Sequence, residues 1–303
     1  MAGKPAFLIY LEYFFAKPFL VFPTLFSYRI NMKVAKILGI LAYYLVASAR
    51  KVSMRNLELV FKDEFTKARR KEITKKVFIN MGYTLFELIN FPNLHDDFFK
   101  KKVYTHRLEN VKKALDKGKG VIACTCHLVN WEVAAAATAL SGIPVNAIVR
   151  LLDNPLLDDY VESYRREKGV KIIPKQYALK RGIRALRNNE LLAILVDQNA
   201  AVNGEFVPFF GIPASTMRGA AVFHKMTGSP VICCYQIRKD NGEHHIYYSE
   251  EIPMTRNIQK DLSTIMHFYE DIIIRYPENY LWVHPRWKKR PEGEDTLYPG
   301  IPL

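Results

Sequence analysis

Apolar positions in the first third of the chain recur at helical spacing. Residues 6–26 are almost continuously apolar, and residues 64–91 repeat apolar side chains three or four positions apart with almost no turn signal. The stripe in the second of these segments consists of Val77, Phe78, Met81, Leu85 and Leu88. We therefore expect residues 1–95 to be helical.

The pattern changes at residue 103, where short apolar runs begin to alternate with amphipathic segments. The apolar runs predict strands at residues 121–126, 145–149, 171–173, 191–196, 231–237 and 245–249. The amphipathic segments predict helices at residues 131–140, 155–168, 178–187, 217–227 and 257–275. This alternation is typical of an α/β fold with a mostly parallel central sheet and flanking helices, here preceded by an N-terminal helical membrane-docking segment.

Three parts follow from these patterns: a membrane-anchoring helix at residues 1–30, a helical region at 31–95 and an α/β domain at 96–303. No small-residue cleavage site follows the first apolar segment, so it is not a cleavable signal peptide. Its length can cross a bilayer, although Glu12 and Lys17 would each cost about 2.5–3.5 kcal/mol at mid-membrane. A tilted span, an interfacial helix and a buried helical hairpin all stay open.

The chain of 303 residues carries a formal net charge of +14, which favours a nucleic acid, an anionic membrane or an acidic protein as partner. Its basic residues are spread along the sequence without a compact stripe, and no segment resembles a nucleic-acid-binding module. We therefore expect a membrane and no nucleic acid. Lys and Arg residues that follow the first apolar segment place the rest of the chain on the cytoplasmic side.

The four cysteines, Cys124, Cys126, Cys233 and Cys234, lie in apolar runs that predict buried strands. A Cys-x-Cys-His sequence, formed by Cys124, Cys126 and His127, is similar to a metal-binding motif. No second Cys/His pair lies at the spacing of a zinc site. Buried free thiols in a reducing compartment are the interpretation that fits. The chain also lacks a G-x-S-x-G elbow, a G-x-G-x-x-G loop and a P-loop, which argues against serine hydrolases, dinucleotide enzymes and P-loop kinases.

The segment with the clearest chemistry begins at His127, which follows a predicted strand, and ends at Glu132, in the first turn of a predicted helix. The end of a strand is where α/β sheets place their ligands. Asn130 is a good N-cap for that helix, and Gly142 a plausible stop. The turn between strand and helix can bring the carboxylate to the imidazole, which predicts a general base acting on an acceptor hydroxyl.

Other candidate residues follow strands or line loops. Arg150 follows the strand at residues 145–149 and is suited to a phosphate or a thioester oxygen, and Asp197 ends the strand at 191–196. Ser215 or Thr216 can cap a helix that holds Arg218, which predicts an anion site. The remaining candidates form an apolar loop suited to an acyl-chain tunnel or to lipid contact: Phe206, Phe209 and Phe210.

An ordered set of motifs covers nearly the whole chain: SMRNL at 53–57, HLVNWE at 127–132, VR and DNP within 149–155, VDQ at 196–198, FVPFFG at 206–211 and LWVHPRWK at 281–288. The set resembles the late lipid A acyltransferases, the lauroyl- and myristoyl-type enzymes of Gram-negative bacteria, within the wider H-x4-D/E lysophospholipid acyltransferase superfamily. The chain departs from the family pattern at Val129, where Gly is common, and at Leu151, where Pro is common. The first departure bears on the loop geometry and the size of the acceptor.

The resemblance implies an O-acyltransferase on the cytoplasmic face of the inner membrane, with His127 and Glu132 as its catalytic pair. The substrate-binding residues that we expect are Asn130, Arg150, Asp197, Gln198, Phe209, Phe210 and Arg218. The donor would be an acyl thioester on acyl carrier protein or coenzyme A, and the acceptor a membrane glycolipid, most simply a lipid A precursor. Transfer would be direct, without a covalent acyl-enzyme, a metal or another cofactor.

Two alternatives stay open at this point. The acceptor can be another lipid, such as a phosphatidylinositol mannoside or a lysophospholipid. A protein that does no chemistry and only binds membranes through its basic residues also fits the charge of +14.

Overall fold

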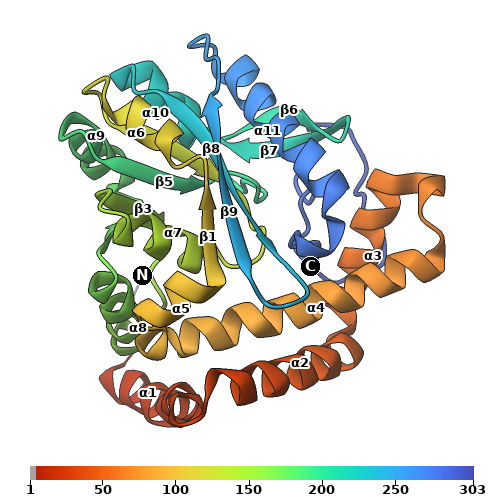
Figure 1. Cartoon of the computed structure of the whole chain (residues 1–303). Helices are drawn as coiled ribbons and strands as arrows, with labels where there is room; N and C mark the ends of the chain where they lie inside the picture. The colour runs from red at the N-terminus through yellow and green to blue at the C-terminus, as the bar shows by residue number, and fades with distance from the viewer. Residues whose placement is uncertain (1–4) are drawn as a thin grey trace.

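In the computed structural model, which describes residues 5–303, seven strands form a central sheet in the order β1-β9-β8-β2-β5-β3-β4 (Figure 1). Every neighbouring pair is parallel except β8 and β9, so the predicted mostly parallel α/β sheet is confirmed. The strands are β1 (Val103–His106), β2 (Val121–Thr125), β3 (Val145–Val149), β4 (Val170–Pro174), β5 (Leu191–Leu195), β8 (Val231–Arg238) and β9 (His244–Glu251).

Helices make up the regular structure before β1 in the described part of the chain, as predicted. The α-helices are α1 (Ala6–Val21), α2 (Tyr28–Leu45), α3 (Ala47–Phe61), α4 (Lys67–Ile89), α5 (Asp96–Lys102), α6 (Glu109–Leu115), α7 (Trp131–Leu140), α8 (Pro155–Glu167), α9 (Ala178–Arg187), α10 (Gly219–Thr227) and α11 (Ile258–Arg275). Short 3-10 turns lie at η1 (Phe22–Leu25), η2 (Lys62–Glu64), η3 (Phe91–Asn93), η4 (Lys175–Tyr177) and η5 (Pro277–Asn279).

Both faces of the sheet are covered by helices, which explains why the sequence of β2 is continuously apolar. Val121 and Ala123 pack into the cluster formed with α6 and α7, whereas Ile122 and Cys124 pack into the cluster formed with α9, α10 and α11. Successive side chains of a strand point to opposite faces, so a strand that is buried on both sides needs apolar residues at every position. The carboxyl ends of β2 and β5 therefore meet at one edge of a fully buried sheet.

The predictions were wrong at a second, two-stranded sheet. The aromatic stretch expected to be a loop forms β6 (Gly204–Phe209), which pairs with β7 (Ile212–Met217) in an antiparallel hairpin against α11. Ser215 and Thr216 belong to β7, and α10 begins only at Gly219 without a side-chain cap, so neither residue is the predicted helix cap. The short elements β1 and α6 were not predicted either.

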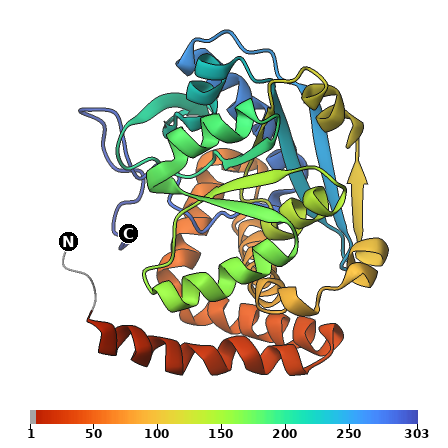
Figure 2. The same ribbon diagram turned by 90° about the vertical axis from the view of Figure 1, so that its left-hand side faces the viewer.

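The N-terminal helices α1 and α2 form a layer at one end of the molecule, on the outer side of α4 (Figures 1 and 2). Helices α2 and α4 touch closely at Gly39, where an added Cβ would lie 2.7 Å from the backbone of Ile79. The outer surface of the layer is apolar: Phe14 and Phe19 of α1 are 71% and 76% exposed. The stretch Ala6–Leu25 is long and apolar enough to cross a membrane, and within the described structure only Pro23 of this stretch is buried.

Candidate active site

His127 lies in the loop that follows β2, where two groups from the end of β5 hold it. Its backbone N–H donates to Asp197 Oδ2 at 3.0 Å, and its ring Nδ1 lies 2.8 Å from Asp197 Oδ1. The other ring nitrogen, Nε2, lies 3.1 Å from the amide Nε2 of Gln198. β2 and β5 are parallel neighbours, so their ends deliver these side chains to the same place.

These contacts define the tautomer of the imidazole. A carboxylate only accepts hydrogen bonds, so Nδ1 carries a proton and donates a hydrogen bond to Asp197. Nε2 then carries a lone pair instead of a proton, and this lone pair accepts a hydrogen bond from the Gln198 amide. Burial alone raises the pKa of Asp197, but attraction to His127 and hydrogen bonds from it outweigh burial and lower that pKa below its usual range. Asp197 therefore stays ionised and holds the imidazole in one orientation.

The backbone around His127 is clamped by the segment that follows α11. Leu281 N–H donates to His127 O at 3.1 Å, and Val129 N–H donates to Asn279 O at 3.0 Å. Val129 adopts φ 56°, in the left-handed region that a β-branched residue rarely enters. Glycine reaches this conformation at no steric cost, so the backbone here is the kind for which glycine is best suited. In this chain, neighbouring contacts hold a strained Val in its place.

Glu132 lies in the first turn of α7, as predicted, but its carboxylate is bonded to Arg165 of α8. Arg165 donates from Nε to Oε2 at 2.9 Å and from Nη2 to Oε1 at 2.6 Å, a two-point pair with both side chains mostly buried. Burial alone lowers the pKa of Arg165, yet the hydrogen bonds and charge of Glu132 raise it above its usual value. No hydrogen bond among the described residues joins Glu132 to His127, so their catalytic pairing stays a prediction.

Arg165 was missed because a basic residue in the last turn of an amphipathic helix has no local signal of function. The two-point pair is visible only once α8 is placed beside the start of α7. It tethers the first turn of α7, and with it the loop that carries His127, to α8, the helix that connects β3 and β4.

Asn130 caps α7 as predicted: its side-chain oxygen accepts from the backbone N–H groups of Glu132 and Val133, at 3.1 and 3.3 Å. Its amide also donates to Glu87 Oε2 at 2.8 Å. Glu87, on α4, is fully buried and was not predicted as part of the site. The helix continues to Leu140, and Gly142 follows with φ 83°, which confirms the predicted stop.

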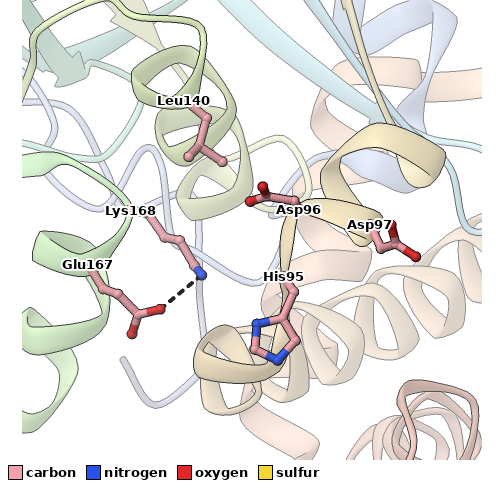
Figure 3. A pocket seen from close by; sticks show the side chains of 6 residues that line it. All are labelled: His95, Asp96, Asp97, Leu140, Glu167 and Lys168. Carbon is pink, nitrogen blue, oxygen red and sulfur yellow. Dashed lines mark hydrogen bonds and ion pairs between the residues drawn. The ribbon is translucent and has the colours of Figure 1, made fainter.

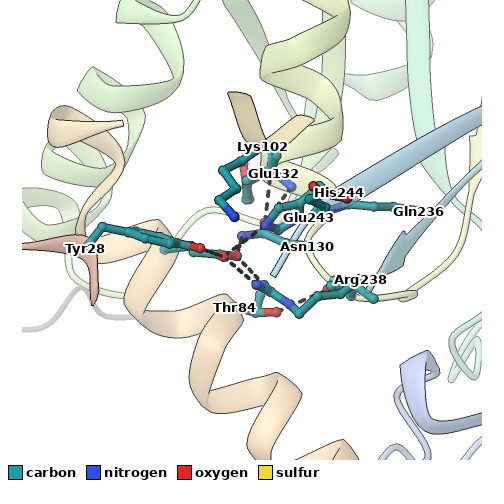
Figure 4. A network of polar contacts seen from close by, with 12 residues as sticks. Tyr28, Thr84, Lys102, Asn130, Glu132, Gln236, Arg238, Glu243 and His244 are labelled. Carbon is teal, nitrogen blue, oxygen red and sulfur yellow. Dashed lines mark hydrogen bonds and ion pairs between the residues drawn. The ribbon is translucent and has the colours of Figure 1, made fainter. Parts of the chain in front are cut away.

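Glu87 is the centre of a buried polar network, and Figure 4 labels its partners Tyr28, Asn130, Arg238 and His244. Arg238 Nη1 donates to Glu87 Oε1 at 2.7 Å, Tyr28 Oη donates to the same oxygen at 2.7 Å, and His244 Nε2 lies 3.0 Å from it. Burial alone raises the pKa of Glu87, but the charges of Arg238 and His244 and their hydrogen bonds lower it well below its usual range. The network joins α2, α4, β8 and β9 behind the His127 loop.

A groove of about 280 Å³ opens at His127, with Val129, Trp131 and Glu132 along one side. Its opposite wall is the apolar stripe of α4 that the sequence pattern identified, at Val77, Met81, Leu85 and Leu88. Trp131 also packs edge-on against the imidazole, with ring centroids 4.6 Å apart. The histidine therefore faces an apolar surface suited to an acyl chain.

A different cavity, of about 510 Å³, lies where the start of α5 faces the ends of α7 and α8 (Figure 3). Its lining is mostly charged, and Lys168 bonds to Glu167 at 3.1 Å. It shares no residue with the groove at His127, and its polarity does not suit an acyl chain.

Two predicted basic site residues lie on the surface. Arg150 follows β3, and His127 follows β2. The expected proximity of the two residues required these strands to be neighbours, but β5 lies between them. Its side chain is 80% exposed and contacts Asp153 at 3.3 Å. Arg218 lies 3.7 Å from Glu205 and is 44% exposed.

The predicted aromatic residues belong to the core of the β6–β7 hairpin. Phe209 is completely buried, with its ring near those of Tyr280 and Trp287 and under the guanidinium of Arg286. Phe210 packs against Phe209 and faces Trp282. Neither ring lines the groove at His127, since both are held behind it by the segment after α11.

The cysteines are all buried thiols, as predicted. Burial raises the pKa of Cys124 and of Cys234 to about 12, and that of Cys126 and Cys233 well above the usual value. They stay protonated at neutral pH and are not nucleophiles.

A histidine that is held by a carboxylate and opens onto an apolar groove, on an α/β sheet next to an apolar helical layer, suits the general-base chemistry of an acyltransferase. Residues 2–289 match the family model described as bacterial lipid A biosynthesis acyltransferase. The chain belongs to this family and is an O-acyltransferase, which confirms the resemblance found in its motifs.

Similar proteins carry names of the same kind. The lipid A biosynthesis palmitoleoyltransferase of Escherichia coli (strain K12) is 26% identical over 265 residues, which cover 86% of each chain. The lipid A biosynthesis lauroyltransferase of the same organism is 26% identical over 266 residues, again 86% of each chain. A lipid A biosynthesis acyltransferase of Haemophilus influenzae is 22% identical over 281 residues, 91% of this chain and 87% of the relative.

Proposed function

We propose that this protein moves a fatty acyl group from an acyl thioester to a hydroxyl group of a lipid A precursor, with His127 as general base. The observation that carries the proposal is the imidazole itself, which is hydrogen-bonded through Nδ1 to Asp197 and belongs to a residue that lines an apolar groove. The names of the similar proteins support a lipid A acceptor and a fatty acyl group.

In the proposed reaction, His127 Nε2 takes the proton of the acceptor hydroxyl as its oxygen attacks the thioester carbonyl carbon. The carbon–sulfur bond then breaks, and the leaving thiolate takes up the proton that His127 holds. Asp197 stabilises the imidazolium between these two steps and keeps the ring in one orientation. The acyl group passes directly from thioester to alcohol, without a covalent acyl-enzyme.

The other predicted residues take supporting roles in this proposal. Gln198 occupies the position near Nε2 that the hydroxyl would share. Asn130 orients the loop through its cap and its bond to Glu87. Glu132 either pairs with His127, as the H-x4-E spacing predicts, or acts through its observed bond to Arg165. The exposed Arg150 and Arg218 would touch only the outer parts of a substrate.

We also propose acyl carrier protein as the donor and the cytoplasmic face of the inner membrane as the location. An acidic carrier is attracted to a chain with a net charge of +14, and attraction of this kind speeds encounter. The apolar side chains of α1 and α2 provide the surface that would enter the lipid. Comparing kcat/KM for the same acyl chain on carrier protein and on coenzyme A tests the choice of donor.

The central test is transfer of a labelled acyl chain to a lipid A precursor in detergent, with the product identified by mass spectrometry. His127→Ala should lower the rate by about 10²–10⁴, the usual contribution of a general base. His267→Ala is the matched control, because that histidine lies on the surface of α11 with its side chain 77% exposed. Near-wild-type turnover in folded His127→Ala, or an equal loss in the control, would refute the assignment.

A further inference from the structure

A third cavity, of about 780 Å³, lies between α2, α4 and the turn that joins β8 to β9. In Figure 1 this turn reaches down to α4, with α2 on the outer side of the same helix. Of the side chains that line the cavity, seven are basic, and only Asp240 and Glu278 are acidic. This composition is suited to an anion with more than one negative charge.

Three of the basic groups are already engaged. Arg238 is bonded to the buried Glu87, Lys76 lies 3.3 Å from Glu72, and Lys102 donates to Asn241 O at 3.3 Å. The other four are Arg29, Lys33, Lys36 and Lys239, and none forms an ion pair with any residue from 5 to 303. The free charge is therefore concentrated on α2 and on the β8–β9 turn.

This cationic cavity adjoins the groove at His127, because Asn80, Glu278 and Asn279 line both. Asn80 donates to Glu278 O at 2.8 Å, and the side chain of Asn279 accepts from Arg238 N–H at 2.9 Å. The backbone oxygen of Asn279 accepts a hydrogen bond from the backbone N–H of Val129 in the His127 loop. One molecule with an anionic group in the cavity can thus extend past these shared residues towards His127.

The position of the free cations on α2 indicates what carries the anion. Arg29, Lys33 and Lys36 are spaced four and three apart and share one side of the helix. The neighbouring stripe of the same helix exposes apolar side chains, including Ile37 at 58% and Leu41 at 47%. Where such a stripe enters a bilayer, the adjacent cations lie at the depth of lipid head groups.

We propose that this cavity binds a phosphate group on the sugar head group of the acceptor lipid, and that Lys33 and Lys36 are its principal contacts. The assignment rests on the proposed transfer to a lipid A precursor and adds the group by which the acceptor is recognised. A phosphate monoester carries nearly two negative charges at neutral pH and accepts several hydrogen bonds, which lysine ammonium groups donate.

The test compares two acceptors, a phosphorylated glycolipid and the same lipid with its phosphate removed. Lys33→Gln/Lys36→Gln should raise KM for the phosphorylated acceptor by about tenfold, the scale of a charge-assisted hydrogen bond, with kcat unchanged. KM for the dephosphorylated acceptor should be the same in the variant and the wild type. The control is Lys112→Gln/Lys113→Gln on α6, which removes the same charge at the other end of the molecule (Figure 1).

An equal rise in KM for both acceptors, an effect in the control or a higher KM only for the acyl carrier donor would overturn the proposal. A binding measurement separates it from the proposed function. Neutral phosphatidylcholine vesicles that contain either glycolipid are sedimented with the His127→Ala protein, which needs no turnover. The site is supported if binding depends on the phosphate and the Lys33→Gln/Lys36→Gln change abolishes that binding, even if the wild type transfers no acyl group. Equal binding to vesicles with and without the phosphate refutes the site.

Discussion

The N-terminal layer of α1 and α2 differs from the rest of the molecule, here called the α/β body, in how charged side chains are paired. In the body, three buried carboxylates each hold a partner: Asp197 the ring of His127, Glu132 the guanidinium of Arg165, and Glu87 that of Arg238. On α2, Lys33 and Lys36 form no ion pair within the described chain and stand beside exposed apolar side chains. The body is thus organised before substrate arrives, whereas the layer is suited to an external surface.

This difference predicts different consequences of substitution. Removing one partner of a buried ion pair leaves an uncompensated charge, so changes in the body should damage activity or folding. Exposed charges and apolar groups contribute little to folding, so changes in the layer should leave the body intact and alter only its encounter with lipid. Substitutions at both places, in order of decreasing expected effect, test this division.

Asp197→Asn should produce the largest loss. An asparagine amide can donate to Nδ1 and thereby favour the tautomer with its proton on Nε2, which cannot act as base. We expect kcat to fall by about 10²–10⁴, measured with saturating donor and acceptor. The thermal unfolding midpoint of the variant shows whether the loss reflects chemistry, and a folded variant with near-normal kcat would mean that Asp197 does not orient the base.

Glu132→Gln should lower kcat by an amount on the order of 10². The observed bond to Arg165 offers a way to find the cause. If Glu132 acts through Arg165, Arg165→Gln alone should cost as much as Glu132→Gln, and the double variant no more than either. If Glu132 acts on His127 directly, Arg165→Gln should keep most of the activity, and the two losses should add.

Glu87→Gln should mainly reduce stability. The substitution keeps the shape of the side chain but leaves Arg238 charged and buried, which typically costs about 3–5 kcal/mol. The measurement is the denaturant or thermal midpoint in detergent. Glu72→Gln is the matched control on the same helix, because Glu72 is half exposed and its pairs with Arg69 and Lys76 lie on the surface. An equal change in both would show that the buried network has no special role.

The sequence predicted the body well where a local rule decides the structure. The helix α7 has the predicted bounds because Asn130 caps it and Gly142 follows it, and β2 was found because a strand buried on both faces is continuously apolar. The β6–β7 hairpin was missed because its aromatic residues were predicted to form an apolar loop, whereas contacts with the segment after α11 bury Phe209.

The sequence pointed to His127, Asn130 and Asp197 as candidates and to Asn130 as the cap of α7, but it did not predict the contact between Asp197 and the imidazole. Sequence spacing pointed to Glu132 as partner of the imidazole, since only a local carboxylate is visible to a spacing rule. Asp197 is 70 positions away and reaches the ring because β5 lies beside β2 in the sheet. Arg165 and Glu87 likewise act through tertiary contacts that no local pattern reports.

In the N-terminal layer, removing residues 1–28 should move the protein from the membrane fraction towards the soluble one. A milder change is Phe14→Ser/Phe15→Ser/Phe19→Ser, which keeps the helix but removes exposed apolar area. We expect partial release in a sedimentation assay and an unchanged unfolding midpoint. Leu152→Ser, on the exposed surface of the body, should have no effect on either. Unchanged partition of the triple variant would place the membrane contact elsewhere.

Val129 lines the groove between the His127 loop and α4. Val129→Gly removes a left-handed strain of about 1–2 kcal/mol and loses buried apolar area worth about 1.5–3 kcal/mol, so the net change in stability should be small.

The sharper readout of Val129→Gly is substrate choice, since the two methyl groups narrow the groove beside His127. In a competition between donors with a straight and a branched acyl chain, followed by mass spectrometry, the variant should shift towards the bulkier chain by about tenfold, the discrimination that one methylene supplies. Val129→Ala separates the two causes, because it removes the same methyl groups but keeps a Cβ in the left-handed conformation. If groove width decides, Ala and Gly should shift selectivity alike. A shift in Gly alone would assign the effect to the backbone, and no shift in either would show that the acyl chain does not pass Val129.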